Sequence, residues 1–178
     1  MKIRTDFITN SSSTSYIIIH KNVPSLIPSE VYTLGKKGKT DFGRFWERYN
    51  DVYSKLNYLA IAILTCDISQ EKKLYYRKML DSILLVYGWS LHWDDIISMI
   101  ENSDAYIDHQ SLDIAEQTLE YIMNDKTLLL AFLYSDKSSV IMGSDESMYR
   151  NVLKELTECA INSDYSVIMN LYGINVIE

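Results

Sequence analysis

The chain is poor in the residues that make turns and linkers. Its 178 residues include 6 glycines and 2 prolines. Repeated tight turns and flexible linkers depend on these two residue types, so their scarcity argues against an all-β sandwich and against several linked domains. The length also suits one domain with a sizeable core. We therefore expect a single domain over residues 1–178.

Cysteine is equally scarce. The two cysteines, Cys66 and Cys159, each lie in a stretch with apolar periodicity. We expect both to be buried free thiols of a cytoplasmic protein, because disulfides persist mainly in oxidising compartments. No Cys-x-x-Cys pair or cysteine–histidine cluster occurs, which argues against a structural zinc site. No cofactor is predicted.

The sequence also lacks an excess of positive charge and a long apolar run. It has 17 lysines and arginines against 24 acidic residues, a net charge of −7. Binding to duplex DNA needs a dense field of basic residues, so we do not expect it. The longest apolar run, 56–64, is far shorter than the ~20 residues of a membrane helix. The first 13 residues lack the apolar segment of a signal peptide, so we expect a cytoplasmic location and no membrane contact.

The clearest periodic segment is 42–65, for which we predict one long helix. Its apolar residues recur at alternating spacings of three and four, which places them in one stripe. They are Phe42, Phe45, Tyr49, Val52, Leu56, Leu59 and Ile63. The stripe is wide, which favours packing within the chain. A homodimer formed through helix 42–65 is the alternative.

Four further helices are predicted. The first begins at Asp67, which forms a capping box with Gln70, and ends at Gly88 in the left-handed cap position. Its inward-facing residues are expected to be Tyr75, Met79, Ile83 and Val86. The others are predicted at 93–101, 112–123 and 146–161.

Strands are expected near both termini and in the centre. The continuous apolar run 127–134 predicts a buried strand, paired with 138–142 in a central hairpin. The other expected strands are 2–8 and 15–20, which form an N-terminal hairpin, then 30–34 and the C-terminal 174–177. Residues 165–172 fit a helix or a strand. Together these elements predict an α+β fold, a small and mostly antiparallel sheet covered by a layer of helices.

Seven consecutive small polar residues, 9–15, separate the two strands expected near the N-terminus. The simpler interpretation is a hairpin connection, because asparagine and serine side chains satisfy turn backbones. The alternative is an anion-binding nest of backbone N–H groups and hydroxyls. Its candidate ligand-binding residues are Arg4, Thr9, Asn10, Ser11, Ser12 and Ser13.

Residues 4–17, RTDFITNSSSTSYI, resemble a signature R-x-D-F-V-T-N-S-S-S-S-S-F. That signature opens many small, uncharacterised proteins of bacteria, archaea, phages and other mobile elements, whose remaining sequences diverge. Here Ile8 stands for valine, Thr14 for a serine and Tyr16 for phenylalanine. The resemblance covers less than a tenth of the chain. It implies a genomic setting and places no catalytic residue.

The segment 35–40, GKKGKT, ends like a phosphate-binding loop. The first glycine of that motif would fall at Thr33, and no parallel-sheet pattern accompanies it, so we interpret the segment as a solvated basic turn. Lys36, Lys37 and Lys39 are nevertheless the densest positive patch of an acidic chain. We take them as candidate partner contacts.

Histidines and carboxylates cluster at 92–109, with the residue types of a divalent-metal hydrolase. They are His92, Asp94, Asp95, Asp104, Asp108 and His109. Their spacing matches no ligand motif, and helix caps and surface charges explain them, so no metal site is predicted. No G-x-S-x-G elbow occurs either. The sequence therefore assigns no catalytic residue and favours a protein that is not an enzyme.

Aromatic residues are abundant, with 14 tyrosines and 3 tryptophans. These two types anchor protein interfaces. Pairs such as Tyr75 with Tyr76, and Trp89 with Trp93, cannot all point inward, so we expect exposed aromatic surface and take Tyr76 and Trp89 as partner contacts. The leading hypothesis is a non-enzymatic interaction protein of a bacterium, phage or mobile element that binds a protein partner, with inhibition of a host or defence system as one form. The alternative is a small phosphate-ligand or nucleotide-binding domain.

Overall fold

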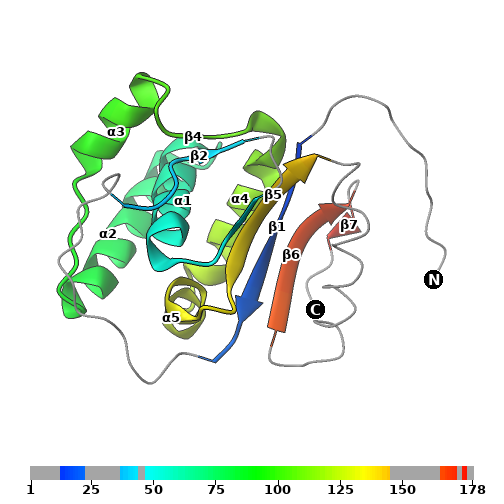
Figure 1. Cartoon of the computed structure of the whole chain (residues 1–178). Coiled ribbons are helices and arrows are strands. Elements are labelled where there is room, and N and C mark those ends of the chain that lie inside the picture. Colours follow the sequence, from blue (N-terminus) through cyan, green and yellow to red (C-terminus); the bar gives the residue numbers. More distant parts are fainter. Residues whose placement is uncertain (1–12, 23–36, 44–46, 145–164, 172–173, 176–178) are drawn as a thin grey trace.

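A sheet of five antiparallel strands and a layer of helices on one of its faces form the core of the fold (Figure 1). The computed structural model describes residues 13–22, 37–43, 47–144, 165–171 and 174–175. The elements are β1 (Ser13–His20), β2 (Asp41–Phe42), β3 (Glu47–Tyr49), α1 (Val52–Thr65), α2 (Gln70–Val86), α3 (Trp93–Glu101), β4 (Tyr106–Ile107), the 3-10 turn η1 (His109–Ser111), α4 (Leu112–Ile122), α5 (Lys126–Tyr134), β5 (Ser139–Ser144), β6 (Tyr165–Leu171) and β7 (Ile174–Asn175). The predicted α+β class is confirmed.

The central strand of the sheet is β1, in the order β3-β5-β1-β6-β7. Tyr16 lies opposite Ile141 of β5 on one side and Met169 of β6 on the other. Because both edges of β1 are taken, the predicted pairing of 15–20 with 2–8 in an N-terminal hairpin is wrong. Residues 2–8 and the expected strand 30–34 lie outside the described residues.

At the C-terminal end, β6 settles the choice left open for 165–172, which is a strand rather than a helix. β7 confirms the beginning of the expected strand 174–177. The predicted helix 146–161 and Cys159 lie outside the described residues. Cys66 is a buried free thiol, as expected, and burial raises its pKa to about 12.

The long helix predicted from Phe42 begins ten residues later, at Val52. Asp51 caps α1, its carboxylate accepting a 2.8 Å hydrogen bond from Ser54 N. Of the preceding apolar residues, Phe42 belongs to β2 and Tyr49 to β3, which pair with β4 and β5, while Phe45 lies outside the described residues. Every residue from Ser54 to Ile63 is buried in the core. That burial leaves no apolar face for a homodimer through helix 42–65, and the alternative is wrong.

The second helix, α2, is capped two residues later than predicted. Its cap is Ser69, whose Oγ accepts from Lys72 N at 3.2 Å, rather than Asp67. It ends as predicted, with Gly88 in the left-handed region at φ +77°. The residues that face the core are Tyr76, Leu80, Ile83 and Leu84. Of the four residues expected to point inward, only Ile83 is fully buried.

Two of the shorter helices match their predicted ranges, since α3 is 93–101 and α4 is 112–122. The run 127–134 is a helix, α5, and not a strand. Asp125 caps it by accepting from Thr127 N and Leu128 N at 2.8 and 3.2 Å. α5 packs against β1, α1 and α4, so it needs little polar face, which is why its sequence looks like a buried strand. The central hairpin is therefore also wrong, because β5 pairs with β1 and β3.

A lysine lies inside this helical layer. Lys55 of α1 is fully buried, and its ammonium donates to the carbonyl oxygens of Ser135 and Ser138 at 2.7 and 3.2 Å. These two residues belong to the turn between α5 and β5. Burial lowers the pKa of Lys55 to about 7.

Among the described helices, none has the length and apolar character needed to cross a bilayer.

Candidate functional site

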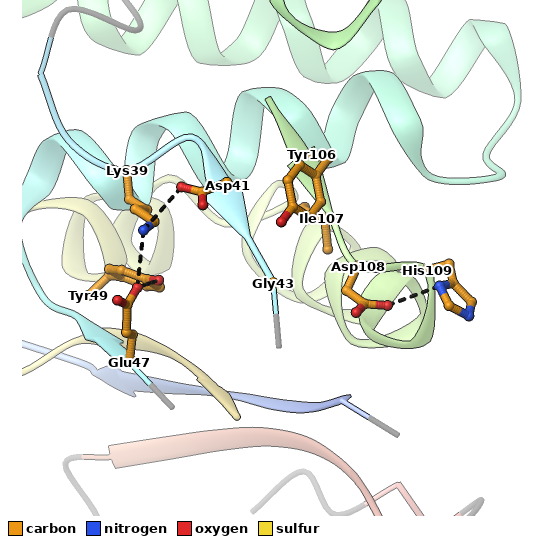
Figure 2. A pocket seen from close by; sticks show the side chains of 9 residues that line it. All are labelled: Lys39, Asp41, Gly43, Glu47, Tyr49, Tyr106, Ile107, Asp108 and His109. Carbon is orange, nitrogen blue, oxygen red and sulfur yellow. Dashed lines mark hydrogen bonds and ion pairs between the residues drawn. The ribbon is translucent and has the colours of Figure 1, made fainter. Parts of the chain in front are cut away.

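A pocket of about 420 Å³ lies where β2 and β4 approach β3 (Figure 2). We call it the Lys39 pocket. β2 and β4 are parallel, with Asp41 opposite Tyr106 and Phe42 opposite Ile107, and Asp108 N donates to the Phe42 carbonyl at 2.9 Å. This pairing sets two distant segments side by side. The lining residues are Lys39, Asp41, Gly43, Glu47, Tyr49, Tyr106, Ile107, Asp108 and His109.

One wall of the pocket is a chain of charged hydrogen bonds. Lys39 Nζ lies 3.1 Å from Asp41 Oδ1 and 3.3 Å from Glu47 Oε2. The Tyr49 hydroxyl donates to the same Glu47 oxygen. The hydrogen bond to Asp41 raises the pKa of Lys39, while the bond from Tyr49 lowers the pKa of Glu47. Both groups therefore keep their charges at neutral pH, and neither is suited to exchange protons there.

The opposite wall holds Asp108 and His109. The Asp108 side chain is 6% exposed, and His109 Nδ1 lies 3.0 Å from its Oδ1. Tyr106 closes over Gly43, where a Cβ would lie 2.8 Å from the Tyr106 hydroxyl. The lining carries three carboxylates against one lysine and one histidine, so its net charge is negative. A negative pocket does not favour a phosphate or nucleotide ligand.

A second feature is the solvent side of α2. Four large apolar side chains there are exposed, and we call them the α2 outer face. They are Leu74 at 52%, Tyr75 at 52%, Leu85 at 74% and Val86 at 68%. Among the described residues Tyr106 is the other exposed large hydrophobic side chain. Apolar groups that gather on one exposed face are typical of an interaction surface.

Beside the outer face runs a groove of about 390 Å³, between α2 and the start of α5. We call it the α2 groove. Its lining residues are Tyr75, Lys78, Met79, Ser82, Ile83 and Lys126. Tyr75 belongs both to the groove and to the outer face, so the two form one continuous surface.

The two aromatic residues predicted as partner contacts are buried, and that prediction is wrong. Tyr76 is 3% exposed and Trp89 is 2% exposed. Trp89 stacks on Tyr53 at 5.6 Å between ring centroids and meets Tyr134 edge-on at 6.1 Å. The expectation that Tyr75 and Tyr76 point in different directions is correct, but Tyr75 is the exposed member.

The basic turn is anchored to α1 rather than free. Asn57 Nδ2 donates to the carbonyls of Lys37 and Lys39 at 3.0 and 2.8 Å. Lys37 Nζ lies 4.9 Å from the centre of the Tyr53 ring, and Lys39 forms the pocket wall. The turn leads into strand β2, so it lacks the helix of a phosphate-binding loop. Lys36 lies outside the described residues.

Residues 9–12 of the hydroxyl-rich segment 9–15 lie outside the described residues, as does Arg4, whereas its last three residues belong to β1. Ser13 begins β1, opposite Ser144. The ligand-binding hypothesis for this segment stays a prediction.

The histidine and carboxylate cluster separates into two places. His92, Asp94 and Asp95 lie at the start of α3, where negative charge favours a helix N-terminus. Asp108 and His109 line the Lys39 pocket. Within the described ranges, no three His, Cys, Asp or Glu residues are placed to hold a metal ion.

Comparison with known proteins gives no family model, no curated protein and no solved structure that matches the chain.

Proposed function

We propose that the protein binds a macromolecular partner through the α2 outer face and does not catalyse a reaction. The observation that carries this proposal is the position of Leu74, Tyr75, Leu85 and Val86 on the solvent side of a helix whose other side already supplies core residues. Single exposed apolar residues are ordinary, whereas a group on one helix face is typical of an interface.

The four side chains of the α2 outer face can contribute only part of the binding free energy that an interface needs. Covering the exposed part of each side chain would contribute about 1–2 kcal/mol. Four of them give several kcal/mol, which is comparable to the lower bound of about 4 kcal/mol for the loss of freedom on association. The outer face therefore anchors a partner, and additional contacts must supply the remaining affinity.

The chemistry of the other candidates supports binding over catalysis. Lys39 is held in its charged form mainly by Asp41, and Glu47 mainly by Tyr49. Cys66 is buried with a raised pKa, which is the opposite of what a nucleophilic thiol requires. The amino-terminal resemblance to proteins of phages and mobile elements leads us to propose a cytoplasmic host protein as the partner, with inhibition as one outcome.

Site-specific cross-linking in bacterial cells tests this proposal. A photo-reactive amino acid is placed at Leu85 in one variant and, as a control, at Lys137 in the exposed turn after α5. We expect one adduct of defined mass from position 85 and none from position 137. Absence of an adduct from position 85, or the same adduct from both positions, would contradict the proposal.

A further inference from the structure

The α2 groove contains a straight apolar row. Tyr75, Met79 and Ile83 lie four residues apart on α2, which spaces them over about 12 Å. Ile83 is buried, Met79 is half-buried and Tyr75 stands at the exposed end. A row of this length matches two turns of a second helix, and the flexible Met79 side chain can adapt to the residues that enter.

The walls of the groove favour a helical occupant over an extended one. Five of the six lining residues belong to α2, whose backbone groups are already bonded within the helix, and the sixth, Lys126, is the first residue of α5. At the start of α5 the N–H groups of Thr127 and Leu128 are taken by Asp125. An extended peptide would find few backbone partners here, whereas a helix satisfies its own backbone.

The basic residues of α2 show where a negative charge would be received. Three of the four are engaged, because Lys72 pairs with Glu120 at 2.8 Å, Lys73 donates to the Leu64 carbonyl at 2.9 Å and Arg77 lies over the Trp93 ring. The fourth, Lys78, lines the groove together with Lys126 of α5. Neither of these two ammonium groups has an ion-pair partner among the described residues.

We infer that the α2 groove binds an amphipathic helix of a partner protein, with its apolar residues on Tyr75, Met79 and Ile83 and with Asp or Glu residues facing Lys78 and Lys126. The inference rests on the function proposed above and specifies the chemistry of the partner. The two lysines supply the additional contacts that the outer face requires. They also select an acidic partner although the chain as a whole has a net charge of −7.

Two synthetic helical peptides of identical composition and zero net charge test the inference. In the first, glutamates flank an apolar row with i, i+4, i+7 spacing and lysines occupy the far side; in the second, the glutamates and lysines are exchanged. Binding of each labelled peptide to the full chain is measured by fluorescence anisotropy. We expect the glutamate-flanked peptide to bind about tenfold more tightly than its isomer, which requires the two exposed ion pairs to contribute about 1.4 kcal/mol together.

Charge reversal on the protein provides the second arm. Lys78→Glu and Lys126→Glu should each weaken the glutamate-flanked peptide about fivefold, and the double variant should prefer the isomer. Lys137→Glu is the matched control, because it makes the same charge change at the opposite end of α5 and should leave both affinities unchanged.

Equal affinity for the two peptides, or no binding of either, would overturn the inference. So would a dimer in light scattering that Tyr75→Glu dissociates, because a second copy of the chain would then cover the groove. If the Leu85 cross-link persists in the Lys78→Glu/Lys126→Glu variant, the proposed function stands and the acidic helix is rejected. If position 85 gives no cross-link in a chain that carries no other substitution, the proposed function itself is rejected.

Discussion

Replacement of Lys55 by methionine should remove a pH dependence of stability that this one side chain creates. Lys55 lies in the middle of α1 with its ammonium 6.0 Å from the Phe132 ring, and it donates to the carbonyl oxygens of Ser135 and Ser138. Burial disfavours its charged form, and the carboxylates of Asp51 and Asp136 favour that form without offsetting burial. Its pKa is therefore lowered from 10.5 to about 7 in the folded chain.

The sign and size follow from proton linkage. Between pH 7 and 10.5 the unfolded chain holds a proton on Lys55 that the folded chain has largely lost, so the free energy of unfolding rises with pH. From pH 7 to 8.5 the rise is about 1.6 kcal/mol for a folded pKa of about 7. Below pH 7 both states become protonated and the dependence levels off. Above pH 9 the opposite effect begins, because burial raises the pKa of Cys66 and of Tyr58 in the folded chain.

Urea unfolding followed by tryptophan fluorescence at pH 7.0, 7.5, 8.0 and 8.5 measures this slope. The free energy of unfolding of the unmodified chain should rise by about 1.6 kcal/mol across this pH range, and that of Lys55→Met should rise by less than about 0.5 kcal/mol. The methionine leaves two carbonyls without a donor, which shifts the whole curve but not its slope. Lys78→Met, at an exposed position, should keep the original slope. Equal slopes in the unmodified chain and Lys55→Met would refute the role of the buried lysine.

Two further predictions concern glycine conformation and a helix cap, and both are measured as free energies of unfolding in urea. Gly88→Ala should cost about 1 kcal/mol, because its φ of +77° disfavours a side chain although no atom lies within 4 Å of the new Cβ. Gly38→Ala should cost more, since its Cβ would lie 2.5 Å from Ser54 N in addition to a φ of +78°; similar costs would contradict the steric explanation. Asp125→Ala should cost about 0.5–2 kcal/mol by removing the α5 cap, whereas Asp125→Asn should cost less than the alanine, and an equal loss would count against capping.

The sequence predicted those elements whose ends carry a local signal. Gly88 marks the end of α2 because only the left-handed conformation fits there, and α3 and α4 each have one buried stripe. Two segments were mispredicted because their partners lie elsewhere in the fold. Phe42 and Tyr49 fit a helical spacing, yet they belong to β2 and β3, which pair with β4 and β5. α5 is buried against three elements and has almost no polar face, so its sequence shows no helical alternation of polar and apolar residues. Asp125, just before α5, is a helix-cap signal that could have identified it.

The candidate surface was harder to predict for the same kind of reason. α2 carries apolar residues on two sides, and a period of 3.6 cannot tell which side meets the core. The side that includes Tyr76 packs against the core, and the neighbouring Tyr75 therefore points to solvent. Trp89 is likewise buried by Tyr53 and Tyr134, which lie 36 and 45 positions away in the sequence. No local pattern contains that information.

The two sides of α2 can be separated by experiment because they contribute to different free energies. Leu80 and Leu84 are buried, so their truncation would cost about 2–5 kcal/mol of folding stability. Leu85 is 74% exposed, so Leu85→Ser should change folding stability by less than about 0.5 kcal/mol. Any binding that Leu85→Ser abolishes can therefore be assigned to the interface and not to unfolding. That separation makes the outer face a surface whose apolar residues the fold itself does not require.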